Sequence, residues 1–263
     1  MYIGEWKNDI PEGYGIFYYP NGLRYEGEFK NGSMQGYGAE YFLNGLIYAG
    51  EYKNNIKEGY GIFFFANGGR YIGGVKNNMR EGYGKEYYSD GSKYKGTYKN
   101  DKKEGYGIDY YPNGIIYKGI FRNKKREGFG IVYFPNGDKY IGNFKNDWRE
   151  GYGIQYFADG SRYKGEWIKD KKSGFGILYY NNKIVYKGEW ENNMKEGYGI
   201  LYYSDGGRYQ GTFKNNMKEG YAVEYLFDGS RYESKFKNGK YEGKGILYFG
   251  NGNSFQLDFE NRI

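Results

Sequence analysis

The sequence YEGEFKNGSMQGYGAEYFLNG, from Tyr25 to Gly45, contains the pattern that decides the fold. A related sequence, YKGEWENNMKEGYGILYYSDG, runs from Tyr186 to Gly206. Both begin with tyrosine, have glycine two residues later and an aromatic residue two residues after that. Both then contain a Gly-Tyr-Gly triplet and end in an Asn-Gly or Asp-Gly pair. Because internal repeats of 20–50 residues are typical of solenoids and other arrays, this recurrence governs the interpretation of the whole chain.

The same phrase begins every 23 residues, without insertion or deletion. Its starting residues are Tyr2, Tyr25, Tyr48, Tyr71, Tyr94, Tyr117, Tyr140, Tyr163, Tyr186, Tyr209 and Tyr232, and Phe255 takes the twelfth place. Eleven full repeats and a terminal half-repeat therefore cover residues 1–263 as a single array. The sequence leaves no room for a second domain.

Each repeat contains two stretches typical of β-strands. Residues 25–30 alternate apolar or small with polar side chains, which is the period of a strand. Residues 36–42 are rich in aromatic residues, which favour extended structure. We expect tight turns at the Asn-Gly and Asp-Gly pairs between repeats, because both residues tolerate positive φ. The residues alone predict an all-β chain of successive hairpins.

These motifs resemble the MORN (membrane occupation and recognition nexus) repeat, whose hallmark is Y-x-G-x-[WF], then N-x-x-x-x-G-[YF]-G, an aromatic pair and an [ND]-G turn. The resemblance covers essentially the whole chain. It implies an elongated sheet of successive β-hairpins, and a scaffold or targeting role rather than catalysis. With native strand spacing and twist, we expect a single-layer antiparallel ribbon with a groove along one face.

The glycines of the repeat predict close packing. Glycine at the third place, as in Gly27 and Gly50, leaves bare backbone between two aromatic neighbours. We expect a ring from the adjacent hairpin to lie over this backbone, an approach that only glycine permits. The second-strand pair, such as Gly59 and Gly61, is expected to do the same on the opposite face.

The composition excludes many kinds of active site. The chain contains no cysteine and no histidine, so disulfides, thiolate nucleophiles, imidazole bases and His/Cys zinc sites are excluded. Carboxylate pairs such as Glu26 and Glu28 recur with the repeat, whereas catalytic residues occupy unique positions. We therefore expect no enzyme activity, no cofactor and no metal.

Basic residues recur in the loop of each hairpin and are densest in the middle of the chain. We predict a basic ladder, which consists of Lys102, Lys103, Lys124, Lys125, Arg126, Arg149, Lys171 and Lys172. Such a ladder could bind anionic lipid headgroups. A parallel series of glutamates, such as Glu58 and Glu81, lies a few residues away, so the alternative is a solvated rim that protects the sheet edge. The net charge of +7 is a weak field over a long array, and we expect no nucleic-acid binding.

One position of the second strand varies while its aromatic neighbours stay constant. We predict that this position carries recognition along a partner groove, as in other repeat scaffolds. The groove residues are Phe17, Phe63, Val132, Leu178, Leu201 and Leu247, with the rings of Tyr180 and Tyr203 beside them. The expected occupant is an amphipathic helix or an extended peptide. Neutral drift at exposed positions is the alternative.

The two ends of the array differ. The last repeat becomes polar, with Ser234 in place of glycine and Lys244 in place of tyrosine, which is typical of a cap. The phrase begins directly at Tyr2, and an uncovered edge strand favours pairing with another chain. We therefore predict end association near Tyr2 and Trp6, either as a homodimer or with a partner.

Together these observations predict a non-enzymatic scaffold for protein–protein interaction. The resemblance implies a cytoskeletal, ciliary or cortical assembly, and the first ten residues have no apolar region of the secretory type, so we expect a cytoplasmic location. An anionic phospholipid-binding module, specific for phosphoinositides, is the alternative function. A regulatory repeat array of a larger enzyme is the third.

Overall fold

The computed structural model describes residues 1–43 and 45–258, in two compact units, Met1–Pro135 and Asn136–Ile263. Every regular element in the described residues is a β-strand, which confirms the all-β prediction. Among these residues, no helix is long and apolar enough to cross a membrane. Asn44, within one predicted Asn-Gly turn, and residues 259–263 of the terminal half-repeat lie outside the described residues.

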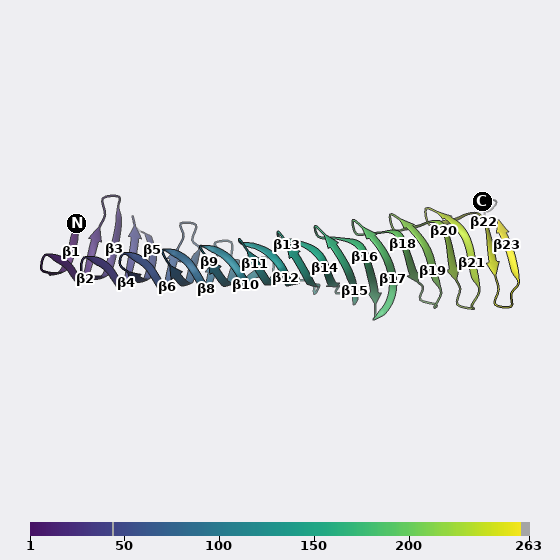
Figure 1. Ribbon diagram of the computed structural model, residues 1–263, viewed down its shortest axis with the longest axis horizontal. Helices are drawn as coiled ribbons and strands as arrows, with labels where there is room; N and C mark the ends of the chain where they lie inside the picture. Colours follow the sequence, from purple (N-terminus) through teal and green to yellow (C-terminus); the bar gives the residue numbers. More distant parts are fainter. Residues whose placement is uncertain (44, 259–263) are drawn as a thin grey trace. The chain divides into compact units, whose positions relative to one another are not determined.

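The first unit holds the first twelve strands (Figure 1). Their bounds are β1 (Tyr2–Lys7), β2 (Ile10–Tyr18), β3 (Leu23–Lys30), β4 (Ser33–Phe42), β5 (Gly45–Lys53), β6 (Ile56–Phe64), β7 (Arg70–Lys76), β8 (Met79–Tyr87), β9 (Lys93–Lys99), β10 (Lys102–Tyr110), β11 (Ile116–Arg122) and β12 (Lys125–Tyr133).

The second unit holds the remaining strands. Their bounds are β13 (Lys139–Lys145), β14 (Trp148–Tyr156), β15 (Ser161–Ile168), β16 (Lys171–Tyr180), β17 (Lys183–Glu191), β18 (Met194–Tyr202), β19 (Arg208–Lys214), β20 (Met217–Tyr225), β21 (Arg231–Lys237), β22 (Lys240–Tyr248) and β23 (Ser254–Asp258).

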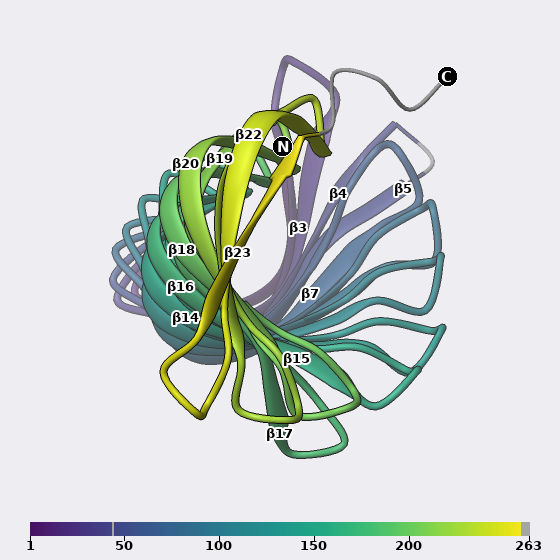
Figure 2. The same cartoon turned by 90° about the vertical axis from the view of Figure 1, so that its right-hand side faces the viewer.

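Within each unit every strand pairs antiparallel with the next strand along the chain. In the first hairpins of the pattern, Gly27 of β3 lies opposite Gly38 of β4, and Gly38 lies opposite Gly50 of β5. Each unit is therefore a single-layer open sheet of consecutive hairpins, as predicted. In the end-on view, successive strands within each unit are rotated relative to one another (Figure 2), which is the twist expected of a β-sheet.

We number the positions of each repeat from 1 to 23, starting at its first tyrosine. The tight turn lies inside the hairpin, at positions 7 and 8. Asn54 and Asn55, for example, have φ of 50° and 68°, which is the backbone of a two-residue type I′ turn. Asparagine and aspartate suit these positions because they tolerate the left-handed conformation.

The expectation that both residues of the Asn-Gly and Asp-Gly pairs between repeats adopt positive φ is wrong. At most of these pairs only the glycine has positive φ, as in Gly22 (87°). The Tyr19 N–H donates to the Leu23 carbonyl at 2.8 Å, and the Gly22 N–H donates to the Tyr19 carbonyl at 3.2 Å. These connections are three-residue loops, in which a type I turn is followed by a left-handed glycine.

The core of each repeat is its first tyrosine. The ring of Tyr48 is fully buried, and its hydroxyl donates a hydrogen bond to the carbonyl of Glu51 at 3.2 Å. A Cβ added to Gly50 or Gly61 would overlap the hydroxyl of this tyrosine. Burial raises the pKa of Tyr48 well above its ordinary value, so the ring stays neutral. A single layer can bury a large ring because two facing glycines leave room for it.

The glycine prediction is corrected on two points. The covering ring belongs to the same hairpin and not to the adjacent one, since Tyr48, Gly50 and Gly61 all lie on β5 and β6. Gly61 is directly opposite Gly50 in the register. Directly paired residues point to one face, so these two glycines do not serve opposite faces.

Edge-to-face ring contacts connect the repeats within each unit. In the second unit the Tyr163 ring lies 5.4 Å from Trp167 of its own repeat and 5.2 Å from Trp190 of the next, at angles of 88° and 79°. Such pairs contribute about 0.5–1.5 kcal/mol each beyond area burial. In the first unit Val75 replaces an aromatic residue and is buried, with 4% exposed. The ring series is thus interrupted there by an aliphatic contact.

The hairpin turns are also linked by polar contacts. The side chain of Asn78 accepts a hydrogen bond from the Lys57 N–H of the preceding hairpin at 2.9 Å, and a Glu58 carboxylate oxygen accepts one from the Asn77 N–H at 3.2 Å. Glu81 and Glu150 bind the following turns in the same way. The acidic series predicted beside the basic ladder therefore holds neighbouring turns together.

Substituting Gly176 by alanine tests the tyrosine–glycine packing. The added Cβ would overlap the ring of Tyr163, so we expect the free energy of unfolding to fall by about 1–3 kcal/mol. Urea denaturation measures this change. Gly250→Ala is the matched control, because nothing lies within 4 Å of its added Cβ.

The wild-type chain already has alanine at the equivalent position of a later repeat, Ala222. In that repeat the interplanar angle between Tyr209 and Phe213 is 71°, whereas the angle between Tyr186 and Trp190 is 89°. Equal stability of the Gly176→Ala variant and the wild-type chain would contradict the role given to this glycine.

Candidate functional site

The two faces of the sheet differ in what they expose. The packed face holds positions 1, 3, 5, 10, 14, 16 and 18, and its tyrosines at position 1 are fully buried between Tyr25 and Tyr209. The open face holds positions 2, 4, 13, 15 and 17. Its position-13 rings are largely exposed, for example Tyr152 at 50% and Tyr221 at 81%. A partner therefore meets either the border of the packed face or the exposed rings of the open face.

The variable position of the predicted partner groove is position 16, and it lies on the packed face rather than at a freely exposed place. Val132 is only 3% exposed and presents little surface to a partner. The other predicted groove residues at this position are half-buried, namely Phe17, Phe63, Leu178, Leu201 and Leu247. Tyr203 is half-buried and Tyr180 is 50% exposed.

Position 10 of each repeat is a candidate site position that the sequence did not distinguish from the exposed basic residues beside it. Its side chain is a half-buried cation in most repeats, and it lies over the aromatic rings of the packed face. The Lys172 ammonium is 5.0 Å from the ring centres of Tyr163 and Trp190 and 5.2 Å from that of Phe157. Cation–π contacts of this kind favour a partly desolvated cation.

Most of these cations have an acidic partner nearby. Arg80 pairs with Glu86 at 2.8 Å, and Lys103 pairs with Asp109 at 2.5 Å. In each case the carboxylate stands at position 16 of the same repeat. Lys218 and Glu224 repeat this arrangement in the second unit at 2.5 Å. A buried carboxylate at position 16 thus neutralises the cation at position 10.

Lys172 and Lys195 are exceptions, because position 16 of their repeats holds Leu178 and Leu201. Neither lysine has a carboxylate partner among the described residues. Burial lowers the pKa of both ammonium groups, and the positive charges of Arg149 beside Lys172 and of Lys218 beside Lys195 lower it further. The second unit therefore presents two adjacent half-buried cations whose charge is not compensated.

A different loop borders a cleft in the same repeats of the second unit. The connection between β16 and β17 turns through Asn181 and Asn182, with φ of 46° and 61°, in place of the usual three-residue glycine loop. β16 has 10 residues, against 8 in β15, and Tyr180 at its end is half exposed. A cleft of about 460 Å³ is lined by Tyr180, Lys183, Ile184, Val185, Tyr202, Tyr203, Ser204, Gly206 and Gly207. Two of the predicted groove residues, Tyr180 and Tyr203, line this cleft, and Leu178 and Leu201 each come two residues earlier in the sequence.

The structure divides the predicted basic ladder into two sets. Lys102, Lys124, Lys125 and Lys171 are exposed. Lys103, Arg126, Arg149 and Lys172 are half-buried on the packed face, because position 10 pairs directly with the buried aromatic residue at position 5, as in Arg149 opposite Phe144. Within the first unit, Lys102, Lys124 and Lys125 therefore remain candidates for a solvated ladder.

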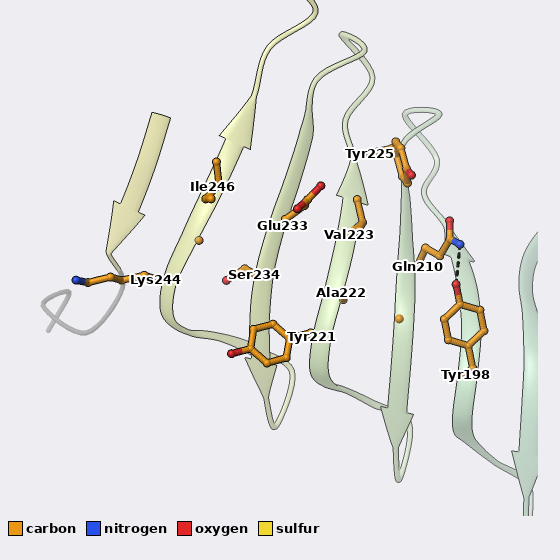
Figure 3. A pocket seen from close by; sticks show the side chains of 12 residues that line it. Tyr198, Gln210, Tyr221, Ala222, Val223, Tyr225, Glu233, Ser234, Lys244 and Ile246 are labelled. Atoms are coloured by element: carbon orange, nitrogen blue, oxygen red, sulfur yellow. Dashed lines mark hydrogen bonds between the residues drawn. The ribbon is translucent and has the colours of Figure 1, made fainter. Parts of the chain in front are cut away.

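A second hollow, of about 500 Å³, lies on the open face of the second unit (Figure 3). It forms where Lys244 takes the place of a position-13 tyrosine and where Ser234 and Ala222 replace glycines. The Gln210 amide donates to the Tyr198 hydroxyl at 2.6 Å at one end of the hollow. Its acidic residue Glu233 pairs with Arg231 at 3.0 Å.

The first strand shows the features on which the predicted end association depends. Within the first unit β1 pairs with β2. Trp6 is 56% exposed although the Tyr2 ring packs against it at 5.0 Å. End association through Tyr2 and Trp6 remains a prediction.

The family model described as MORN repeat matches the chain in eleven consecutive segments, residues 2–24, 25–47, 48–70, 71–93, 94–116, 117–139, 140–162, 163–184, 186–208, 209–231 and 232–254. No curated protein sequence matches the chain.

Several solved structures are similar at low identity. The wild-type TCP10 domain of Danio rerio CPAP, in complex with a peptide of STIL, is 13% identical with a TM-score of 0.42, and the match covers 98% of this chain and 99% of that one. The TCP domain of Drosophila melanogaster SAS-4, in complex with a proline-rich motif of Ana2, is 18% identical with a TM-score of 0.36, covering 59% and 84%. A virginiamycin B lyase from Staphylococcus aureus is 11% identical with a TM-score of 0.18, covering 96% and 85%. These similarities carry no argument about function.

Lys195 and Lys218 occupy the same position in adjacent repeats and give opposite predictions. Lys195→Met removes an uncompensated charge and keeps the side-chain volume, so we expect the variant to be at least as stable as the wild-type chain. Lys218→Met leaves the carboxylate of Glu224, 4% exposed, without its cation, so we expect a loss of about 1–3 kcal/mol. Urea denaturation at pH 7 measures both.

The stability difference between Lys195→Met and the wild-type chain should also depend on pH. A lowered lysine pKa disfavours the charged form in the folded state, so its cost is fully present below the folded pKa and disappears as the pH rises through the unfolded pKa. The advantage of Lys195→Met should therefore decline as the pH rises from the folded pKa toward 10.5, the ordinary pKa of lysine, and be absent above it. A stabilised Lys218→Met variant, or a destabilised Lys195→Met variant, would contradict the charge assignment.

Proposed function

Because this chain belongs to the MORN repeat family, we propose that it is a non-enzymatic scaffold that binds other proteins through the second unit. The binding site is the cleft between the β16–β17 and β18–β19 hairpins together with the adjoining packed face. Its residues are Leu178, Leu201, Tyr180 and Tyr203. The occupant is a peptide segment of a partner protein.

One observation carries this proposal, namely the opening of the packed face at the Asn181-Asn182 turn. Elsewhere in the second unit, the position-18 ring of one repeat covers the cation of the next, as Phe157 covers Lys172 and Tyr203 covers Lys218, both at 5.2 Å. Tyr180 makes no such contact with Lys195 among the described aromatic contacts, and half of its surface is exposed. Exposed aromatic rings beside apolar side chains are typical of peptide-binding grooves.

Membership of the MORN repeat family supports the proposed cellular setting of the scaffold. This setting is a cytoplasmic assembly associated with the cytoskeleton, a cilium or the cell cortex. The repeated packing supports the structural part of this role, because an array with many equivalent repeats presents an extended surface. The uncompensated lysines and the cleft favour a protein partner over a membrane surface, since they are half-buried whereas lipid headgroups require exposed cations.

The test is selection of a phage-displayed library of random 16-residue peptides on the purified chain. We expect enrichment of a consensus, and a synthetic consensus peptide should bind Tyr180→Ala at least tenfold more weakly than the wild-type chain, because the variant removes a ring that lines the cleft. Calorimetry measures the two affinities.

Phe42→Ala is the matched control. Phe42 also occupies position 18 at the end of a longer strand, β4, and is 44% exposed, but it belongs to the first unit. Its binding should stay within twofold of the wild-type value. Absence of a consensus, or equal losses in both variants, would refute the proposed site.

A further inference from the structure

We propose that the partner segment is acidic and supplies to Lys172 and Lys195 the two carboxylates that their own repeats lack. This inference rests on the proposed function, since it names the chemistry of the peptide that the cleft binds. The occupant is an extended segment with two acidic residues about 10 Å apart and apolar side chains beside them.

The neighbouring repeats show where such a carboxylate would lie. In the repeat that follows Lys195, the Lys218 ammonium contacts the Glu224 carboxylate at 2.5 Å across the packed face. Lys172 and Lys195 occupy the equivalent place on β16 and β18. Both lysines lie over the rings at the same positions as those below Lys218. We therefore infer that position 16, which holds Leu178 and Leu201, is where the carboxylate is missing. A partner carboxylate above these leucines would take the place of the internal one.

Three routes neutralise position-10 cations among the described ion pairs, and none of the three is open to the two lysines. Arg80 pairs with position 16 of its own repeat and with Asp101, at position 8 of the next. Lys57 pairs instead with Glu40, at position 16 of the preceding repeat. For Lys172 these places hold Leu178, Asn193 and Gln155, and for Lys195 they hold Leu201, Asn216 and Leu178. All of these side chains are neutral.

The aromatic rings around the lysines would strengthen an ion pair with a partner carboxylate. The Lys195 ammonium is 5.3 Å from the ring centre of Tyr186 and 5.7 Å from that of Phe213. Rings exclude water on one side, and an ion pair is stronger where water is excluded. The two ammonium groups have already lost part of their hydration on folding. Binding a carboxylate therefore does not require that part of their desolvation free energy again. Lys183, exposed at the rim of the cleft, adds positive charge on the approach.

The distance between the two lysines favours an extended backbone conformation of the partner segment. Lys172 and Lys195 stand on β16 and β18, which are separated by β17, so equivalent atoms are about 10 Å apart. In a polyproline II segment, residues three apart share one side and are about 9 Å apart. A segment that crosses β16–β18 over the leucines thus places acidic residues at i and i+3 on one flank and its other side chains toward the cleft.

The experiment measures acidic content and charge dependence in the same peptide selection. We expect the consensus to contain Asp or Glu at two places three residues apart, and its affinity to fall at least tenfold for Lys172→Met/Lys195→Met. The double variant Lys164→Met/Lys171→Met is the matched control, because both lysines are exposed on nearby strands and the net charge changes equally. It should bind within twofold of the wild-type chain.

A second variant tests the same idea without removing the lysines. Leu178→Glu/Leu201→Glu copies the Lys218–Glu224 arrangement, so we expect it to fold with at least wild-type resistance to urea and to lose the peptide at least tenfold. Unchanged binding in this variant would overturn the proposal.

The remaining outcomes separate the acidic partner from the scaffold itself. A consensus without acidic residues that still requires Tyr180 would overturn this inference and leave the proposed function standing. Absence of any consensus would overturn both. Phosphatidylserine vesicles that bind the wild-type chain and not Lys172→Met/Lys195→Met, with peptide binding equal in the two, would identify the lysines as a lipid site and refute the peptide partner.

Discussion

The packing of one tyrosine ring over two facing glycines is the constraint on which each repeat depends. The ring of Tyr163 lies over Gly165 and Gly176, where a Cβ would overlap its hydroxyl, and its own hydroxyl hydrogen-bonds to the Glu166 carbonyl at 3.2 Å. This geometry fixes the register of the hairpin. It also places position 5 against the ring, so that the next repeat can add a further edge-to-face contact. A sheet one layer thick thereby obtains a core from its own side chains.

The same packing decides where charge is tolerated. A cation at position 10 lies over the rings and is half-buried, so it is stable where a carboxylate at position 16 compensates it, as in Arg80 with Glu86. Replacing that carboxylate by leucine leaves the fold intact, because leucine packs beside the tyrosine, but leaves the cation unpaired. Lys172 and Lys195 are therefore positions where folding does not require the charge. Beside the Asn181-Asn182 turn, Lys195 also lacks, among the described residues, the covering ring that Phe157 provides at Lys172.

The fold could be predicted from the sequence because the tyrosine, glycine and turn positions recur with a constant period. The turn types could not be predicted, because Asn-Gly pairs are compatible with two loop geometries. The two-residue turn is instead formed by pairs such as Asn54 and Asn55, which contain no glycine. The ladder was predicted as one surface because Lys171 and Lys172 are adjacent in sequence, although alternation places them on different faces of the hairpin. The position-10 cations that lack a carboxylate could have been recognised in the sequence. Glu or Asp follows the position-10 cation by six residues at Arg80, Lys103 and Lys218 but not at Lys172 or Lys195.

Site-specific photo-crosslinking tests most directly the claim that recognition occurs at the interruption of the packed face. A photoreactive phenylalanine analogue would replace Tyr180 in one variant and Tyr152 in another. Both tyrosines are 50% exposed in the second unit, but Tyr180 borders the cleft whereas Tyr152 lies on the open face. The account predicts that a selected peptide crosslinks to position 180 and not to position 152. Crosslinking at position 152 alone would show that the exposed rings of the open face bind the partner and would contradict the account.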